Sequence, residues 1–218
     1  MSYRDQPGDK RGRWTKSGGL LGAGLLAGLV AFAAGGDIVS SVGAGLDTAT
    51  GSEGSSAVKA RRGQQEARQG HDAEALGRLG LKEIKRDSRR ELRCAVQSHG
   101  RVQQYFLQHP CDSLDQLLFA ASDARGNVLV GSVVWVKMPS NTTAAQLKRI
   151  EDTFGSGDVT PFGTEVLGLG GIRFTGTHYR ARLDGPLVVI AETEPVRGRP
   201  PEVLLNEVAA VTDVLPPL

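Results

Sequence analysis

The sequence predicts an α+β protein: a small antiparallel sheet in the order β-β-α-β-β-α with helices on one face, preceded by an N-terminal transmembrane helix. Three observations predict it: one uncharged apolar run near the N-terminus, two pairs of strand-like runs joined by turn-forming residues, and an amphipathic helical pattern after each pair. Glycine accounts for 29 of 218 residues, and the net charge is only +2. This small charge does not favour a nucleic-acid-binding protein.

Residues 17–36 form an uncharged stretch, SGGLLGAGLLAGLVAFAAGG, that is long enough to cross a bilayer as a helix. At 1.5 Å per residue, such a helix spans about 30 Å, the thickness of the hydrocarbon core. The predicted membrane segment begins at Ser17 and ends at Gly36. Its large apolar side chains are distributed along its length and include Leu20, Leu25, Leu29 and Phe32. Basic residues are concentrated in the tail 1–16, which predicts a cytoplasmic N-terminus and an extracellular C-terminal part.

A cleaved signal peptide is the alternative interpretation of the same segment. The triplet Ala31-Phe32-Ala33 resembles a small-residue cleavage site, and cleavage after Ala33 would release a secreted protein. The apolar run continues beyond the length of a signal-peptide core, so an uncleaved anchor at the plasma membrane is favoured. The lipid bilayer is then a partner of residues 17–36.

Two further segments precede the predicted sheet. Residues 37–58 are rich in Gly, Ser, Ala and Thr, which is typical of a flexible linker. Residues 59–93 carry eleven basic and six acidic residues, and we expect a charged helical stalk there. Within it, the pattern predicts a well-formed helix only from about Leu81 to Cys94.

The basic stretch KEIKRDSRRELR at 82–93 is a candidate binding surface for an envelope protein or an anionic envelope polymer. Its interspersed acidic residues favour i, i+4 ion pairs on a solvated helix instead. Nucleic acid is not expected as a partner, because this part of the chain is predicted to lie outside the cell.

Residues 94–218 have the pattern of a folded extracytoplasmic domain. RVQQYFLQHP predicts a helix that ends before Pro110. DQLLFAAS and NVLVGSVVWVKM, joined by DARG, predict a hairpin. The second of these runs is apolar on both alternating faces, which indicates a central strand covered on both sides.

The second half of this domain repeats the arrangement. In SNTTAAQLKRIEDTFG, Ser140 or Asn141 is the expected N-cap of a helix and Gly155 the expected stop. GIRFTGTHYRAR and PLVVIAETE, joined by LDGP, predict a second hairpin. Pro200 and Pro201 are expected to start a last helix.

Cys94 and Cys111 are the only cysteines, and both fall in the part predicted to lie outside, where disulfides persist. We therefore predict that they pair. His99 and His109 lie between them, but the spacing C-x4-H-x9-H-x-C matches no common zinc pattern. The sequence predicts neither a metal site nor a cofactor.

Catalytic signatures such as G-x-S-x-G, H-E-x-x-H and the Walker loop are missing from the sequence. The weak candidates for a site are His178, Tyr179, Glu192 and Glu194. Glu192 and Glu194 are expected on the same side of a strand, as a carboxylate pair would be, although a solvated strand face explains them more simply. A structural or surface role is the simpler explanation for His178.

Four stretches carry a resemblance: RCAVQSHGRVQQYFLQHPC, SLDQLLFAASDARGNVLVGSVVWVKMP, GSGDVTP and TGTHYRARLDGPLVVIAE. Together they resemble a family of uncharacterised membrane-anchored or secreted proteins from high-GC actinobacteria. The resemblance covers about residues 82–218 and implies one apolar N-terminal segment, a two-cysteine element and an envelope-facing domain. It transfers no catalytic residue to this chain.

The expected function is that of a single-pass membrane protein that presents a non-enzymatic binding or interaction module outside the cell. The alternative is an envelope hydrolase or transferase, anchored or secreted, whose site assembles from residues distant in sequence.

Overall fold

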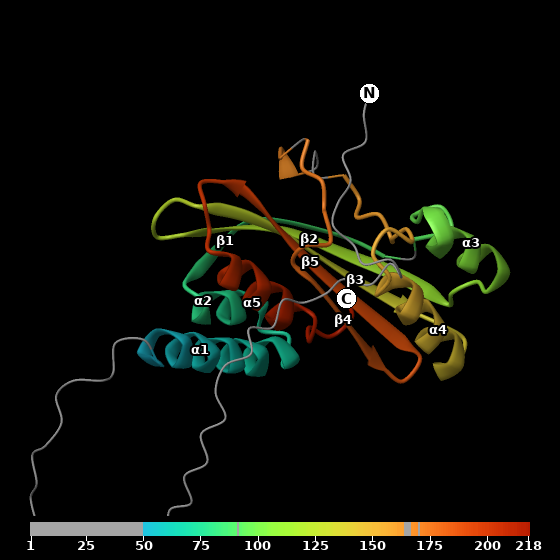
Figure 1. The fold of residues 1–218 in the computed structure, drawn as a ribbon, viewed down its shortest axis with the longest axis horizontal. Helices are drawn as coiled ribbons and strands as arrows, with labels where there is room; N and C mark the ends of the chain where they lie inside the picture. The colour runs from blue at the N-terminus through green and yellow to red at the C-terminus, as the bar shows by residue number, and fades with distance from the viewer. Residues whose placement is uncertain (1–49, 91, 164–166, 170) are drawn as a thin grey trace, which may run out of the picture. The chain divides into compact units, whose positions relative to one another are not determined.

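The computed structural model describes residues 50–90, 92–163, 167–169 and 171–218, which belong to one compact unit beginning at Gly45. Five strands form an antiparallel sheet in the order β1-β2-β3-β5-β4, and helices lie against it (Figure 1). The tail 1–16, the expected membrane segment 17–36 and the first part of the expected linker lie outside the described residues. Among the helices of the described part, none combines the length and the apolar character needed to span a bilayer.

The elements follow one another along the chain as follows: α1 (Thr50–Arg68), α2 (Asp72–Arg78), β1 (Leu81–Arg89), α3 (Gly100–Gln108), β2 (Ser113–Asp123), β3 (Val128–Lys137), α4 (Asn141–Glu151), β4 (Tyr179–Asp184), β5 (Leu187–Arg197) and α5 (Glu202–Thr212). From β2 onward this is the order β-β-α-β-β-α that the sequence predicts. The α+β class and the antiparallel sheet are therefore confirmed.

Local hydrogen bonds explain the ends of these elements. Asp123 Oδ1 accepts the N–H groups of Arg125 (2.8 Å) and Asn127 (2.9 Å), which closes the turn between β2 and β3. Ser140 is the N-cap of α4, because its hydroxyl accepts the N–H of Thr143 at 3.2 Å. Both the turn and the cap were predicted from the sequence.

The helix expected from Leu81 to Cys94 is wrong, since residues 81–89 form the edge strand β1. It pairs antiparallel with β2, with Leu81 opposite Asp123 and Arg89 opposite Gln116. Charged residues on an edge strand reach water as easily as on a helix, and they discourage pairing with another chain. Arg86 pairs with Asp72 of α2 and, at 3.3 Å, with Glu83, so its partners include one from another element.

Residues 59–93 do not form a stalk outside the sheet domain. Helix α1 begins at Thr50, within the segment expected to be linker, and packs along α5. Gly63 allows this close approach, because a Cβ at that position would lie 3.1 Å from Val211 Cγ2. Side chains of α1, α2 and β1 share a core with those of α5, so the boundary expected at residue 93 falls inside one folded unit.

Helices cover both faces of the sheet, so the prediction of helices on one face is wrong. Figure 1 shows α1, α2 and α5 gathered together, and their side chains pack on the sheet face that includes Val133 and Trp135. Helices α3 and α4 pack on the opposite face, against Val134 and Val136. The two-sided burial predicted for β3 is confirmed, because every residue from Val128 to Val136 is buried.

The disulfide between Cys94 and Cys111 is confirmed, with the two Cα atoms 6.3 Å apart. It ties the segment after β1 to the segment before β2, across α3. Cys94 is buried in the apolar cluster that includes Val102 and Phe106 of α3. The bond therefore fastens α3 to the sheet.

Replacing both cysteines, Cys94→Ser with Cys111→Ser, should lower the free energy of unfolding by about 3 kcal/mol, because the unfolded chain gains the freedom of a 17-residue separation. Urea denaturation followed by circular dichroism measures this. A reductant should destabilise the unmodified protein and leave the double variant unchanged; equal sensitivity of the two proteins would contradict the prediction.

Candidate functional site

A row of buried polar side chains crosses the sheet face that α3 and α4 cover. Gln116 of β2, Ser132 of β3 and Glu192 of β5 form this polar row, and all three are buried. Ser132 lies directly opposite Glu192 in the ladder. The row separates the apolar cluster under α3 and α4 from a smaller cluster that includes Phe162 and Leu167.

Gln116 fastens the segment after α4 to the sheet. Its amide Nε2 donates to the carbonyl of Thr160 at 3.1 Å, and its Oε1 accepts the N–H of Phe162 at 2.9 Å. Its polar groups are thus used to position backbone. Glu192, at the other end of the row, faces an open pocket instead.

The pocket has a volume of about 420 Å³ and lies where α4 ends, beside β4 and β5. Residues 151–158 and 174–176 form most of its wall, together with His99, Gly100, Tyr179 and Glu192. Four carboxyl groups line it: Glu151, Asp152, Asp158 and Glu192. The site therefore combines residues from four parts of the chain that are distant in sequence.

Two glycines bring the wall together. The N–H of His99 donates to the carbonyl of Asp158 at 3.0 Å. Gly157 has φ +113°, and a Cβ there would lie 2.2 Å from His99 O, so only glycine fits. Gly100 faces the same contact, because its Cβ would lie 2.6 Å from Ser156 O. This backbone contact places Asp158 beside the segment that carries His99.

The disulfide supports the same wall. The hydroxyl of Ser98 donates to the carbonyl of Cys94 at 2.8 Å, and Ser98 forms a β-bridge with Val159. His99 Nδ1 lies 3.2 Å from the hydroxyl of Thr160. The pocket wall is therefore joined to the sheet through the cysteine pair as well as through Gln116.

Glu151 and Asp158 form a pair of carboxyl groups within hydrogen-bonding reach of each other. Burial, followed by the charge of Asp158, raises the pKa of Glu151 well above its ordinary value. Burial raises the pKa of Asp158 too, although the hydrogen bond from Glu151 and the charge of His99 act against this. We infer that Glu151 keeps its proton and donates it to the Asp158 carboxylate.

Without that proton, two buried oxygen atoms have no donor. Glu151 Oε1 and Asp158 Oδ1 accept no hydrogen bond from the described residues. Leaving a buried carboxyl oxygen unpaired costs about 1–3 kcal/mol. A shared proton or a bound donor is needed to offset this cost.

Glu192 completes the group of acids. Its side chain is 5% exposed, and burial, followed by the charges of Asp158 and Glu194, raises its pKa to about 8. Asp152 differs from the other three, because Lys148 binds it at 2.6 Å and the hydroxyl of Tyr179 donates to it at 3.2 Å. Burial likewise raises the pKa of the Tyr179 hydroxyl, so this donor stays protonated.

The structure brings together only two of the four candidate residues. Tyr179 and Glu192 lie opposite each other on β4 and β5, and both line the pocket. Glu194 lies beyond it, with its Oε1 accepting the N–H of Thr175 at 2.8 Å. Glu194 thereby holds the pocket wall in place.

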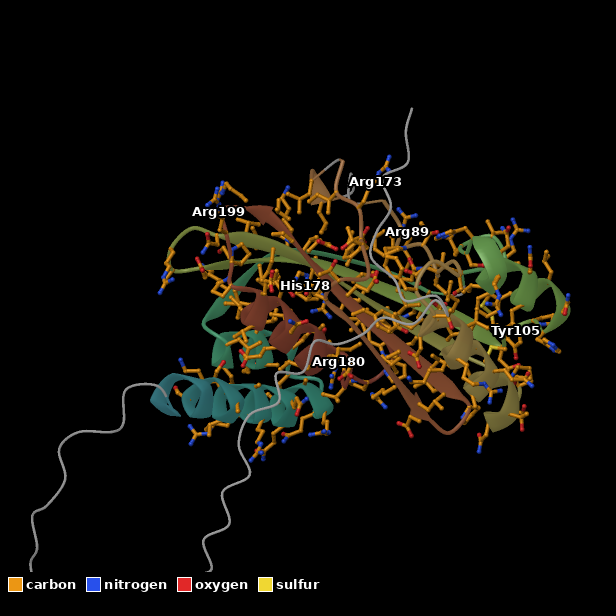
Figure 2. All side chains as sticks on the ribbon, viewed as in Figure 1. Arg89, Tyr105, Arg173, His178, Arg180 and Arg199 are labelled. Atoms are coloured by element: carbon orange, nitrogen blue, oxygen red, sulfur yellow. A yellow bond between two sulfur atoms is a disulfide. The ribbon has the colours of Figure 1, made fainter. Side chains whose placement is uncertain are left out.

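His178 does not line the pocket. It precedes β4, and its carbonyl accepts the N–H of Thr193 at 3.1 Å. Its side chain is buried, and Nδ1 has no partner among the residues that the structure describes. Figure 2 labels His178 and Arg180.

Tyr105, also labelled in Figure 2, connects α3 with α4. Its hydroxyl donates to the carbonyl of Thr143 at 2.9 Å.

The solvated strand face expected for Glu192 and Glu194 is wrong, since their side chains are 5% and 8% exposed. They do share one side of β5, as predicted. Residues 174–176 lie over that side of β5. The alternation of polar and apolar residues along one strand does not reveal whether another segment of the chain will cover it.

The sequence analysis missed Glu151 and Asp158, and with them the carboxyl pair. One signal was present: Glu151 and Asp152 stand at the end of a predicted helix, where the helix dipole favours basic side chains. Ser132 is a second signal, because it interrupts an otherwise apolar strand. Neither signal identifies the partner residue.

Within the described ranges, no three His, Cys, Asp or Glu side chains are placed so that they could hold a metal ion. The pocket offers carboxyl oxygens as hydrogen-bond acceptors, together with the imidazole of His99. Chemically, the arrangement provides a buried carboxyl group with a raised pKa next to other carboxyl groups in an open cavity.

Comparison with protein-family models, with curated proteins and with solved structures finds no match to this chain. The function must therefore be argued from the pocket and its side chains.

Gly157→Ala should lower the free energy of unfolding by about 3 kcal/mol, because the new Cβ overlaps His99 O and the backbone conformation is unfavourable. Gly155→Ala is the matched control: it has φ +76° with open space around it, so it should cost only about 1 kcal/mol. Thermal unfolding of both variants measures the difference, and equal losses would show that the close contact is unimportant.

The free energy of unfolding should fall as the pH rises from about 4.5 to about 8, because the folded state keeps protons on Glu192 that the unfolded state releases. The slope should reach about 1.4 kcal/mol per pH unit for each such proton. Glu192→Gln should flatten this slope and stabilise the protein at pH 8, as measured by urea denaturation at several pH values.

Glu202→Gln, at an exposed position at the start of α5, is the control for the loss of one carboxyl group. It should leave the slope unchanged. A slope that is the same in the unmodified protein and in Glu192→Gln would contradict the assignment of a raised pKa to Glu192.

Proposed function

We propose that this chain is a single-pass protein of the plasma membrane whose α+β domain acts outside the cell as a ligand-binding module, with the carboxyl-lined pocket as its binding site. The observation that carries the proposal is a group of three carboxyl groups at an open pocket: Glu151 and Glu192 are buried, and Asp158 is half-buried. A fold gains no stability from such a group, so its presence favours a function that needs it.

Other features support the location. Residues 17–36 are apolar and follow a basic tail, which favours an uncleaved anchor with the domain outside. The Cys94–Cys111 disulfide is typical of oxidising compartments. Secretion after cleavage near Ala33 is the alternative route to the same compartment. The resemblance to envelope-facing actinobacterial proteins agrees with both.

A second candidate function is hydrolysis or group transfer in the envelope. The Glu151–Asp158 pair favours it, because a carboxyl group with a raised pKa is a general acid and a neighbouring carboxylate is a general base. Tyr179 and Glu192 lie in the same pocket, whereas His178 and Glu194 do not line it. A binding module remains the first proposal, because the hydroxyls of Thr153 and Ser156 at the pocket donate to backbone carbonyls and not to a carboxylate that could act as their base.

Mass spectrometry of the protein from fractionated cells tests the location, with thiols alkylated before or after reduction. We expect the full-length chain in the membrane fraction, with Cys94 and Cys111 modified only after reduction. Loss of residues 1–33 would make the protein secreted. A soluble, full-length chain with reactive thiols would contradict the proposal, and a Cys94→Ser with Cys111→Ser variant controls for unspecific alkylation.

A further inference from the structure

We propose that the pocket binds a primary ammonium group carried on a short aliphatic chain, with Glu151, Asp158 and Glu192 as its acceptors. This inference rests on the proposed binding function and names the chemistry of the ligand. An ammonium group has three N–H donors and no acceptor. The pocket offers it three carboxyl groups, whereas the described residues that line it include no lysine or arginine to bind an anion.

The three acids line the same pocket, and their charges affect one another. The charges of Asp158 and Glu192 both bear on Glu151, and the charge of Asp158 also bears on Glu192. The Glu151 side chain is only 7% exposed, yet its Oε1 has no donor among the described side chains and backbone. Asp158 Oδ1 is also buried and has no donor among the described residues. Unless the two carboxyl groups share a proton, these two acceptor atoms need a donor that the described residues do not supply.

The other charged groups that are described around these acids are mostly paired elsewhere. Those that face them from the neighbouring elements are Lys148 and Asp152 of α4, His99 before α3, Tyr179 of β4 and Glu194 of β5. Lys148 is paired with Asp152, and Glu194 is bonded to Thr175. His99, whose Nδ1 lies 3.2 Å from the Thr160 hydroxyl, is near enough to Asp158 for its charge to lower the pKa of that carboxyl group.

A proton and an ammonium group would compete for the same oxygens. In the empty pocket a proton between Glu151 and Asp158 satisfies both carboxyls. A bound ammonium group offers its own N–H donors to these atoms, so the proton leaves to solvent as the ligand enters. Binding should therefore release protons and strengthen as the pH rises.

The size and lining of the pocket select a small ligand with an apolar stem. A volume of about 420 Å³ accommodates a short diamine or a lysine side chain. Phe154, Phe174 and Tyr179 line the pocket and provide apolar surface for methylene groups. Aromatic rings also attract cations. At Gly176, a Cβ would lie 3.8 Å from Glu192 Oε1 and 4.0 Å from Phe154 Cε2, so an acid and a ring lie together there.

Isothermal titration calorimetry of the full-length chain in detergent tests this inference with 1,5-diaminopentane as the probe. The matched neutral probe is 1,5-pentanediol, which has the same stem and no charge. We expect binding of the diamine at pH 8, about tenfold tighter than at pH 7 for each proton released. Buffers of different ionisation enthalpy count the released protons. Lysine with both backbone ends blocked tests whether a peptide-borne ammonium group binds equally well.

Glu151→Gln and Glu192→Gln should each weaken diamine binding about tenfold or more, and each should also reduce the number of protons released. Glu74→Gln removes one carboxyl group from the exposed surface of α2 and should change neither quantity. Thermal unfolding confirms that the variants are folded.

Two results would overturn the ammonium inference: no binding of either amine, or binding that the two pocket variants leave unchanged. Binding of the diol with the same sensitivity to Glu192→Gln would overturn it as well, while leaving the proposed binding function in place. Failure of the proposed function is distinguished by the fractionation experiment, in which a soluble chain with free thiols would refute the extracellular location whatever the calorimetry shows.

Discussion

The structure depends on one constraint: the central strands β2, β3 and β5 are buried on both faces. Their backbone groups pair along the antiparallel ladders, so a buried side chain on these strands must be apolar or find a partner inside the protein. Most are apolar. The polar row of Gln116, Ser132 and Glu192 is the exception. Backbone groups of Thr160 and Phe162 form hydrogen bonds with the Gln116 side chain.

This arrangement links stability to the site. Gln116 holds residues 160–162, Glu194 holds Thr175, and the glycine contact with the disulfide behind it holds Asp158. These contacts fasten the wall of the pocket firmly. The acids inside it differ from the wall, because burial and the neighbouring carboxyl groups raise the pKa values of Glu151 and Glu192. A well-fastened wall around carboxyl groups with raised pKa values is typical of a site that is organised before its ligand arrives.

Sequence patterns succeeded where local rules decide the structure. The two hairpins, the Ser140 cap and the start of α5 after Pro201 all depend on residues next to one another in the chain. They failed at β1, where alternating charges fit a solvated helix as well as an edge strand. The free edge of β2 decided between the two, and that edge exists only after β2 and β3 have paired. The same reason explains why α1 and α2 joined the core instead of forming a stalk.

By itself, the sequence determined the α+β class, the order of elements from β2 to α5, the two-sided burial of β3 and the pairing of Cys94 with Cys111. Periodicity, turn chemistry and cysteine count are sufficient for these features. The candidate site was decided by tertiary structure alone, because Glu192 of β5 is distant in sequence from Glu151 and Asp158, and the three acids become chemically distinctive only when folding brings them to one pocket. A carboxyl group's pKa depends on the neighbours that exclude water from it, and these neighbours are brought together by folding.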